Sequence, residues 1–186
     1  MKIDTQVITA KVQIFPNEQQ VIELKQMFEL YSLACNWLSK KVFQNKILNQ
    51  VKLHHLVYDE MRSELGTKAQ FTQSVIKTVV ARYKSAKSNG HEWSLVKFSG
   101  NDYDLVWNRD YSLVGHQFSV GVSSGRIKVN FAKKPLSQFQ KAKAKFGSAK
   151  VVNKFGKWFL HIPMSKEVPA LTIDEVSNVV GVDLGI

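Results

Sequence analysis

The chain has 186 residues and carries a formal net charge of +11, because 26 Lys and Arg outnumber 15 Asp and Glu. Hydrophobic residues make up 44% of the sequence, which is enough to build a core and excludes the disordered and low-complexity classes. The length fits one domain or two interleaved domains. Charged residues interrupt every apolar run, so we expect a cytoplasmic protein with no membrane role. A single cysteine, Cys35, excludes an internal disulfide framework.

The excess positive charge lies in one part of the sequence. From Tyr111 to Lys166 the chain has 11 basic residues and no Asp or Glu, whereas the remainder has 15 residues of each sign. A solubilising surface would explain any single lysine, but it does not require the exclusion of acids. A field of one sign over so long a stretch attracts polyanions, so we expect a nucleic-acid partner. The basic residues of this stretch are Arg126, Lys128, Lys133, Lys134, Lys141, Lys143, Lys145, Lys150, Lys154, Lys157 and Lys166.

The first predicted element is a strand from Thr5 to Phe15, where apolar and polar side chains alternate. The even-numbered positions from Ile8 to Ile14 form its apolar face. Pro16 ends the strand. Asn17 is placed to cap a helix, and Gln20, three residues later, completes a capping-box pattern.

Three helices are predicted next. Apolar residues at helical spacing indicate a long helix from Asn17 to about Lys46, a second from about Lys52 to Leu65 and a third from about Phe71 to Ser88. Gly66 ends the second helix. Cations near the end of the third, Arg82 among them, suit the helix dipole without any ligand. Large side chains on the inner face of the first helix are assigned to the core, and these are Met27, Tyr31 and Trp37.

After Gly90 the pattern changes from helical spacing to short alternating runs separated by turns. We predict short strands at residues 94–98, 104–108, 117–122, 126–131, 149–153 and 158–164. The segments between the third and fourth, and between the fifth and sixth, are typical of hairpin turns. Several short strands with regular turns indicate a small barrel or sandwich, and the strand before the helices completes its sheet. The predicted fold class is therefore α+β, a small β-barrel whose first connection is expanded into a three-helix insert.

Residues 135–146 fit either a short helix or a loop. Lys141, Lys143 and Lys145 alternate with alanines there, so a helix would be basic on several sides. A basic segment beside a barrel can grip a phosphate backbone, although a solvated linker explains the pattern equally well.

The last nine residues, N-V-V-G-V-D-L-G-I, place a carboxylate within an apolar strand pattern. A buried Asp183 is destabilising unless it is paired, hydrogen-bonded or bound to a metal. Nucleases of the ribonuclease H type hold such an Asp toward Mg²⁺ on the first strand of their sheet. The same G-x-D-x-G pattern also occurs in sugar-kinase ATPase folds, and a terminal strand with its Asp in solvent would explain it too.

A series of motifs gives this pattern a context. A strand precedes F-P-N-E-Q-Q, which opens a long helix containing Y-S-L-A-C-N-W-L. The basic region then contains S-S-G-R-I-K-V and F-G-K-W-F-L-H-I-P, and V-V-G-V-D-L-G-I follows. In this order the chain resembles the N-terminal half of TnpB, the transposase-like RNA-guided DNA endonuclease encoded by insertion sequences and related to type V CRISPR effectors.

The resemblance implies a domain organisation. Residues 1–15 and 91–172 would form the wedge domain, which is an oligonucleotide-binding-like barrel. Residues 16–90 would form the helical recognition insert, and residues 173–186 would begin a truncated RuvC-like, ribonuclease H-like nuclease domain. The implied partners are a guide RNA and double-stranded target DNA in a prokaryotic cell, where the protein would associate with the nucleoid.

The resemblance also implies roles for individual residues. Asp183 matches the first catalytic carboxylate, which binds Mg²⁺ in that family. The segment from Lys154 to His161, with Trp158, matches the hairpin that precedes the nuclease domain. Asn17, Tyr31 and Asn36 match the region near the reader of the target-adjacent motif.

The catalytic part of the family pattern is incomplete in this sequence. Two-metal hydrolysis needs several carboxylates on different strands, and the later Glu, the later Asp and the cysteine-rich zinc element of the family are missing here. We therefore expect that this chain alone does not cleave DNA, either as a fragment of a longer enzyme or as a natural truncation that binds.

Two other functions fit the sequence. The first is a non-cleaving RNA-guided DNA binder, such as a repressor or an accessory subunit. The second is an unrelated single-domain RNA-binding barrel in which exposed aromatic side chains stack on bases. The candidates for stacking are Tyr103, Trp107, Phe118 and Trp158.

Overall fold

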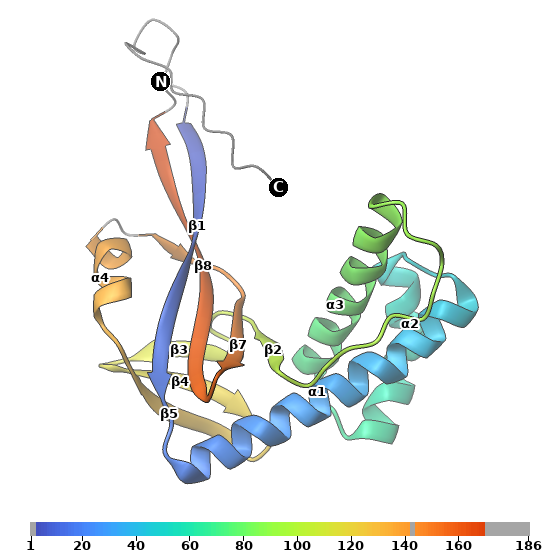
Figure 1. The fold of residues 1–186 in the computed structure, drawn as a ribbon, viewed down its shortest axis with the longest axis horizontal. Coiled ribbons are helices and arrows are strands. Elements are labelled where there is room, and N and C mark those ends of the chain that lie inside the picture. Colours follow the sequence, from blue (N-terminus) through green and yellow to red (C-terminus); the bar gives the residue numbers. More distant parts are fainter. Residues whose placement is uncertain (1–2, 142–143, 170–186) are drawn as a thin grey trace, which may run out of the picture.

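The computed structural model describes residues 3–141 and 144–169, and within them a long first strand leads into three helices and then a series of short strands (Figure 1). The helices are α1 (Glu18–Asn45), α2 (Gln50–Leu65), α3 (Ala69–Ser88) and α4 (Lys134–Lys141). The strands are β1 (Ile3–Phe15), β2 (Asp102–Leu105), β3 (Tyr111–Val114), β4 (Gln117–Val122), β5 (Gly125–Phe131), β6 (Lys145–Phe146), β7 (Ala149–Lys154) and β8 (Lys157–Pro169). This confirms the α+β class predicted from the sequence.

The strands form one antiparallel sheet that closes into a nearly complete barrel. Their order is β2-β7-β8-β1-β5-β4-β3, and β6 pairs with β8 beside this path. The two edge strands, β2 and β3, are consecutive in the chain and are joined by a tight turn in which the Asp110 carboxylate accepts from the Val106 amide at 2.9 Å. An isolated bridge between Trp107 and Tyr111 lies in the same turn. This short turn therefore joins the two edge strands of the sheet directly.

The predicted helices are confirmed, with boundaries shifted by about two residues. The capping box at the start of α1 is present, because the Gln20 amide donates to Asn17 Oδ1 at 2.9 Å and the Asn17 amide donates to Gln20 Oε1 at 3.1 Å. Gly66 closes α2 with a φ of +61°, a left-handed conformation that glycine adopts without strain. Residues 135–146, which fitted either a helix or a loop, begin with helix α4 and end with β6.

The strand predicted at residues 94–98 is wrong. This segment has no regular secondary structure and pairs with no strand among the residues that the structure describes, and it lies along α1 instead. The Asn36 side chain both donates to the Phe98 carbonyl and accepts from the Phe98 amide, each at 2.9 Å, and the Ser39 hydroxyl donates to the Val96 carbonyl at 2.6 Å. Helix side chains thus satisfy the backbone groups that a neighbouring strand would otherwise bind.

The other strand predictions hold to different degrees. The three strands at residues 117–122, 126–131 and 149–153 agree with β4, β5 and β7 to within one residue, and the last predicted strand lies within β8. The strand predicted at 104–108 begins two residues earlier as β2 and ends at Leu105. Strands β3 and β6 were not predicted.

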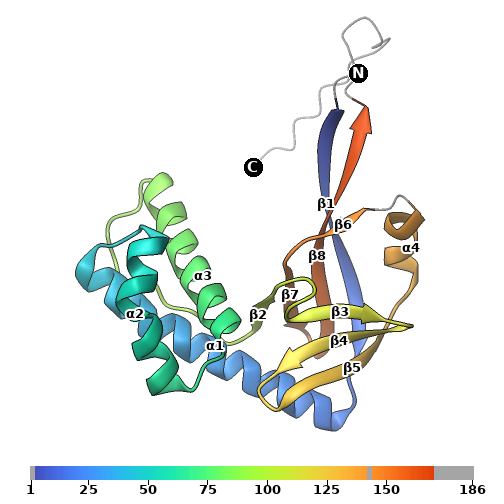
Figure 2. The same ribbon diagram turned by 180° about the vertical axis from the view of Figure 1, so that it is seen from behind.

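Helix α1 connects the barrel with the other helices (Figures 1 and 2). The helices and the barrel share one hydrophobic core. Phe28 on α1 makes the central contact, because its ring stacks on Trp158 of β8 at 5.2 Å and meets Tyr103 of β2 edge-on at 5.9 Å. Figure 1 shows α1 running from the foot of the barrel into the helical group, while the far halves of β1 and β8 project as a two-stranded ribbon. The shared core fixes the helical insert against the barrel.

Some predictions fall outside the described residues. These are Asp183 and the proposed nuclease segment at 173–186, together with Lys143 and the side chain of Lys141. Within the part of the chain that the structure describes, no helix combines the length and the apolar character needed to cross a membrane.

Candidate nucleic-acid interface

The helical group meets the barrel at a polar junction formed by Tyr31, Thr78 and Asp104, which come from α1, α3 and β2. Tyr31 is 3% exposed, and its hydroxyl donates to Asp104 Oδ2 at 2.8 Å. The Thr78 hydroxyl donates to the same oxygen at 2.5 Å. Burial, and then the neighbouring Asp104 carboxylate, raise the pKa of Tyr31 well above its ordinary value, so the phenol keeps its proton.

Lys150 on β7 pairs with both carboxylates at this junction and balances half of their charge. Its Nζ lies 3.1 Å from Asp102 Oδ1 and 3.1 Å from Asp104 Oδ1. Burial alone would lower the pKa of Lys150, but Asp104 and Asp102 outweigh that effect and raise the pKa above its ordinary value. Lys150 therefore stays charged. Because Lys150 already pairs with two carboxylates, it attracts a ligand less strongly than an unpaired lysine at the same position would.

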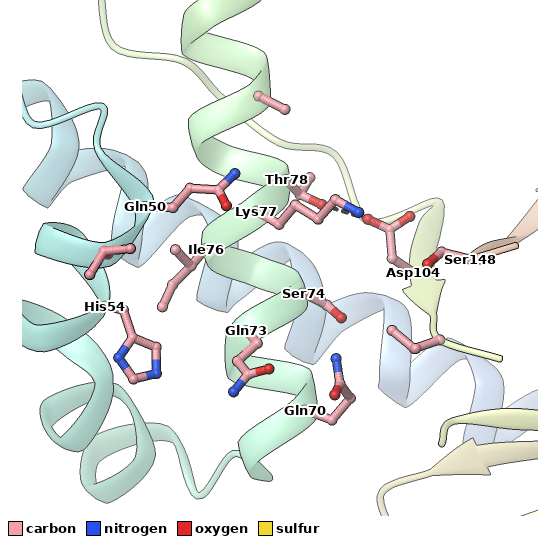
Figure 3. A pocket seen from close by; sticks show the side chains of 13 residues that line it. Gln50, His54, Gln70, Gln73, Ser74, Ile76, Lys77, Thr78, Asp104 and Ser148 are labelled. Carbon is pink, nitrogen blue, oxygen red and sulfur yellow. Dashed lines mark hydrogen bonds between the residues drawn. The ribbon is translucent and has the colours of Figure 1, made fainter. Parts of the chain in front are cut away.

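Two cavities share the contacting residues Thr78 and Asp104 in their walls. The larger, of about 700 Å³, is lined by α2 and α3 on one side and by Asp104 and Ser148 on the other (Figure 3). The second, of about 500 Å³, lies between α3, the segment around Lys97 and the outer face of β2 and β7. Both cavities include Thr78, Ala81 and Asp104 in their walls, and we call them together the interlobe cleft.

The helical side of the interlobe cleft is basic and amide-rich. Lys77, Arg82 and Lys97 line it and are exposed, and none of them forms an ion pair with a described carboxylate. Gln70 and Gln73 extend from α3 into the larger cavity, as Figure 3 shows. Amide groups and cations in a concave site suit the oxygen atoms and base edges of a nucleic acid.

The barrel side of the interlobe cleft continues as a basic row across the outer face of the sheet. Lys150 pairs with His161 across β7 and β8, and His161 pairs with Lys11 across β8 and β1. Residues in register on one face of a sheet point the same way, so these three side chains share the outer face. Lys154 also lies on this face, two pleats along β7 from Lys150. The basic surface thus runs from the cleft toward the β7–β8 turn.

Arg126 on β5 has a structural role in its own sheet. Its guanidinium donates to the Ser119 hydroxyl at 2.8 Å, to the Arg109 carbonyl at 2.8 Å and to the Ser112 hydroxyl at 3.2 Å. These bonds link β3, β4 and the turn before β3. The Arg126 side chain is exposed, but most of its N–H donors are already engaged within the protein.

The remaining predicted cations are distributed around the barrel. Lys145 lies 3.5 Å from Glu167, a contact between two largely exposed side chains that contributes little to stability. Lys166 is half-buried on β8. The others are exposed on β5, next to α4 and at the β7–β8 turn, and these are Lys128, Lys133, Lys134, Lys154 and Lys157.

Four of the predicted nucleic-acid-binding residues have structural roles. Asn17 caps α1, Asn36 holds the segment at Phe98, and Tyr31 belongs to the buried junction. Trp158 is 5% exposed because it stacks on Phe28. Burial leaves Tyr31 and Trp158 no face open to a base, whereas Asn17 is exposed and Asn36 is partly exposed.

The aromatic residues considered for base stacking are also used by the fold. Tyr103 and Phe118 are buried, like Trp158. Trp107 is partly buried and stacks on Phe146 at 4.2 Å. The most exposed aromatic side chain in the described part of the chain is instead Phe155, which was not among the sequence-based candidates.

The described residues do not fit a metal centre. Within residues 3–141 and 144–169, no group of three or more His, Cys, Asp or Glu side chains is arranged to hold an ion. Asp183, which the resemblance to TnpB connects with Mg²⁺, lies outside them. We therefore derive no chemical step through a metal.

Comparisons with known proteins add no assignment. The chain matches no protein-family model, and a search of curated proteins finds no match.

Proposed function

We propose that this chain binds nucleic acid through the interlobe cleft and the adjoining outer face of β7 and β8. The observation that carries the proposal is that cations from separate elements line the two cavities of the interlobe cleft. Lys77 and Arg82 come from α3, and Lys97 comes from the following segment.

On the barrel side, Ser148 and Lys150 of the acid-free stretch line the cleft together with the β2 carboxylates Asp102 and Asp104, both of which pair with Lys150. Four cations therefore face two carboxylates, which leaves the cleft positive. Such a hollow concentrates a polyanion, and each neutralised phosphate releases counterions.

More specifically, we propose that the bound polymer is a structured guide RNA, and that the chain is the nucleic-acid-binding part of an RNA-guided DNA endonuclease of the TnpB type. In that proposal the barrel corresponds to the wedge domain and α1 to α3 correspond to the recognition insert. The motif order in the sequence supports this version, as does the arrangement of a helical insert after the first barrel strand. Target DNA and the Mg²⁺ site at Asp183 belong to the same proposal.

The burial of Tyr103, Phe118 and Trp158 favours a structured RNA over an RNA-binding barrel of the single-strand type. Sequence-tolerant single-strand binders present several aromatic side chains in a row on an open sheet face, where successive bases stack on them. In this barrel those three side chains are buried, and Phe159, which lies beside His161 on the outer face, is only partly exposed. The outer face offers mainly cations and hydrogen-bonding groups, which recognise a shaped phosphate backbone.

A competition experiment tests this function. The full chain is purified from its cellular source, the RNA that accompanies it is sequenced, and that RNA competes with a generic single strand of equal length for binding. We expect one structured RNA to be enriched and to displace the generic strand. Equal competition by both RNAs would instead support a general RNA-binding barrel, and the absence of binding to either would refute a nucleic-acid function.

A further inference from the structure

The turn between β7 and β8 carries an aromatic ring that contributes nothing to the core. Phe155 is 102% exposed, whereas the strand residues on both sides belong to a well-paired hairpin. Burying a phenylalanine side chain would stabilise a fold by about 1.5–3 kcal/mol. The exposed ring of Phe155 does not contribute this stabilisation. Folding stability therefore does not explain why a phenylalanine occupies the turn.

The backbone of the turn is unfavourable for phenylalanine. Phe155 has a φ of +51° and Gly156 a φ of +76°, the pattern of a two-residue turn in which both central residues are left-handed. Asn or Asp followed by Gly is the preferred sequence for such a turn. A bulky side chain in the left-handed region is an outlier, and such strain is concentrated at functional sites.

The flanking charges are also unfavourable for folding. Lys154 and Lys157 are direct cross-strand partners, and both are exposed. Like charges placed opposite each other destabilise a hairpin. A turn selected only for stability would have neither the two lysines nor the phenylalanine.

The turn is nevertheless held firmly in place. Trp158, the next inward-facing residue after the turn, is buried against Phe28 of α1. On the other strand, the Asn153 amide donates to the Asn101 carbonyl at 3.3 Å. The exposed ring of Phe155 therefore projects from an anchored hairpin, and little conformational entropy is lost when a ligand binds it.

We propose that Phe155 stacks on an unpaired base of the bound RNA while Lys154 and Lys157 contact the phosphates on either side. This proposal rests on the nucleic-acid function above and assigns a contact point to it. A planar hydrophobic ring between two cations matches the alternation of base and phosphate in a single strand. Lys154 shares the outer face of β7 with Lys150, so a strand leaving the interlobe cleft along β7 reaches the ring.

The test uses the full chain with Phe155→Asn, which suits the turn and removes the ring. The probe is a single-stranded RNA of about 15 nucleotides, long enough for one binding site, with the fluorescent base 2-aminopurine at successive positions. We expect the unfolding temperature to rise, because Asn relieves the strain. We also expect affinity to fall about tenfold, with an unchanged dependence on salt because no phosphate contact is lost.

A second variant, Phe155→Trp, keeps an aromatic surface and should retain the affinity. In the wild type and in this variant, 2-aminopurine at one position should be quenched by stacking, and the quenching should disappear with Phe155→Asn. Unchanged affinity and quenching in Phe155→Asn would overturn the proposal. A fall in its unfolding temperature would also overturn it, because the ring would then be structural.

These results separate the two proposals. If the wild-type chain binds neither this probe nor the structured RNA that accompanies it on purification, the proposed function fails. If the wild type binds RNA with a strong salt dependence and Phe155→Asn binds equally well, only the stacking contact fails. Wild-type binding to vesicles of anionic lipid that Phe155→Asn abolishes, with RNA affinity unchanged, would assign the ring to a lipid surface and overturn the base contact.

Discussion

His161 lies between two lysines in a row of side chains that crosses three strands. Its partners in register are Lys11 on β1 and Lys150 on β7. Burial lowers the pKa of His161 below its ordinary value of 6.5, and Lys154, Lys11 and Lys150 lower it further. Asp104, at the end of the same row, is engaged by Lys150 and so offsets little of this repulsion. At neutral pH His161 is therefore uncharged.

This row makes RNA binding sensitive to pH. In the free protein, acidification protonates the unfolded chain before His161 in the folded chain, so the folded state loses stability as the pH falls through about 6.5. A bound phosphate backbone reverses the local repulsion and raises the pKa of His161. The complex therefore takes up a proton, and affinity should increase several-fold between about pH 7.5 and about pH 5.5.

Fluorescence anisotropy at constant ionic strength measures this dependence. His161→Gln, which retains a side chain of similar polarity, should bind with a flatter pH profile than the wild type. The other four histidines remain in both proteins and serve as the internal control. An identical profile in the two proteins would mean that the RNA does not contact the row.

At the scale of elements, α1, α2 and α3 could be predicted closely because their apolar residues recur at helical spacing, whereas the short α4 could not be distinguished from a loop. Asn17 and Gln20 specify the start of α1, and Gly66 specifies the end of α2. The segment at residues 94–98 was misassigned because alternation reports only that one side of a segment is covered. It does not report whether the backbone pairs with a strand or with helix side chains such as Asn36 and Ser39.

The candidate site was predicted less well than the fold. The acid-free stretch directed attention to the barrel alone, but Lys77, Arg82 and Lys97, which line the proposed site, belong to the part of the sequence with balanced charge. Their convergence on the barrel is a long-range arrangement that no local pattern encodes. Phe155 did have a local signal, because an aromatic residue before the glycine of a short hairpin turn is unfavourable for folding.

Helix α3 supplies the cations on one wall of the interlobe cleft, so its contribution can be tested as a unit. Replacing Lys77 and Arg82 with Gln should weaken RNA binding, and by a similar factor for every sequence, because phosphate contacts position a ligand without reading its bases. Folding stability should change by less than about 0.5 kcal/mol, since both side chains are exposed.

The matched control for α3 replaces Lys25 and Lys40 with Gln, which removes two exposed charges from α1 outside the cleft. Electrophoretic mobility shifts with several unrelated RNAs give the comparison. We expect the control to bind like the wild type. Equal weakening by the control and by the α3 variant would indicate attraction by net charge alone, with no particular role for the cleft.

At the scale of the whole molecule, the cleft is preorganised by contacts on two levels. The hydrophobic contact of Phe28 with Trp158 and Tyr103 fixes α1 against the barrel. The polar junction of Tyr31 and Thr78 with Asp104 then fixes α3 against β2. One core holds both walls of the cleft, so the distance between the cations of the two walls is fixed before a ligand binds. This preorganisation reduces the conformational entropy lost on binding.

The most direct test is the salt dependence of RNA affinity for the full chain, measured for the wild type and for a variant with Gln at Lys77, Arg82 and Lys154. If the cleft and the outer face of β7 hold phosphates, the logarithm of the association constant should fall linearly with the logarithm of salt concentration. The slope for single strands is about −0.7 for each phosphate, so the variant should be shallower by about 2. A flat response in the wild type, or equal slopes in the two proteins, would contradict binding at this surface.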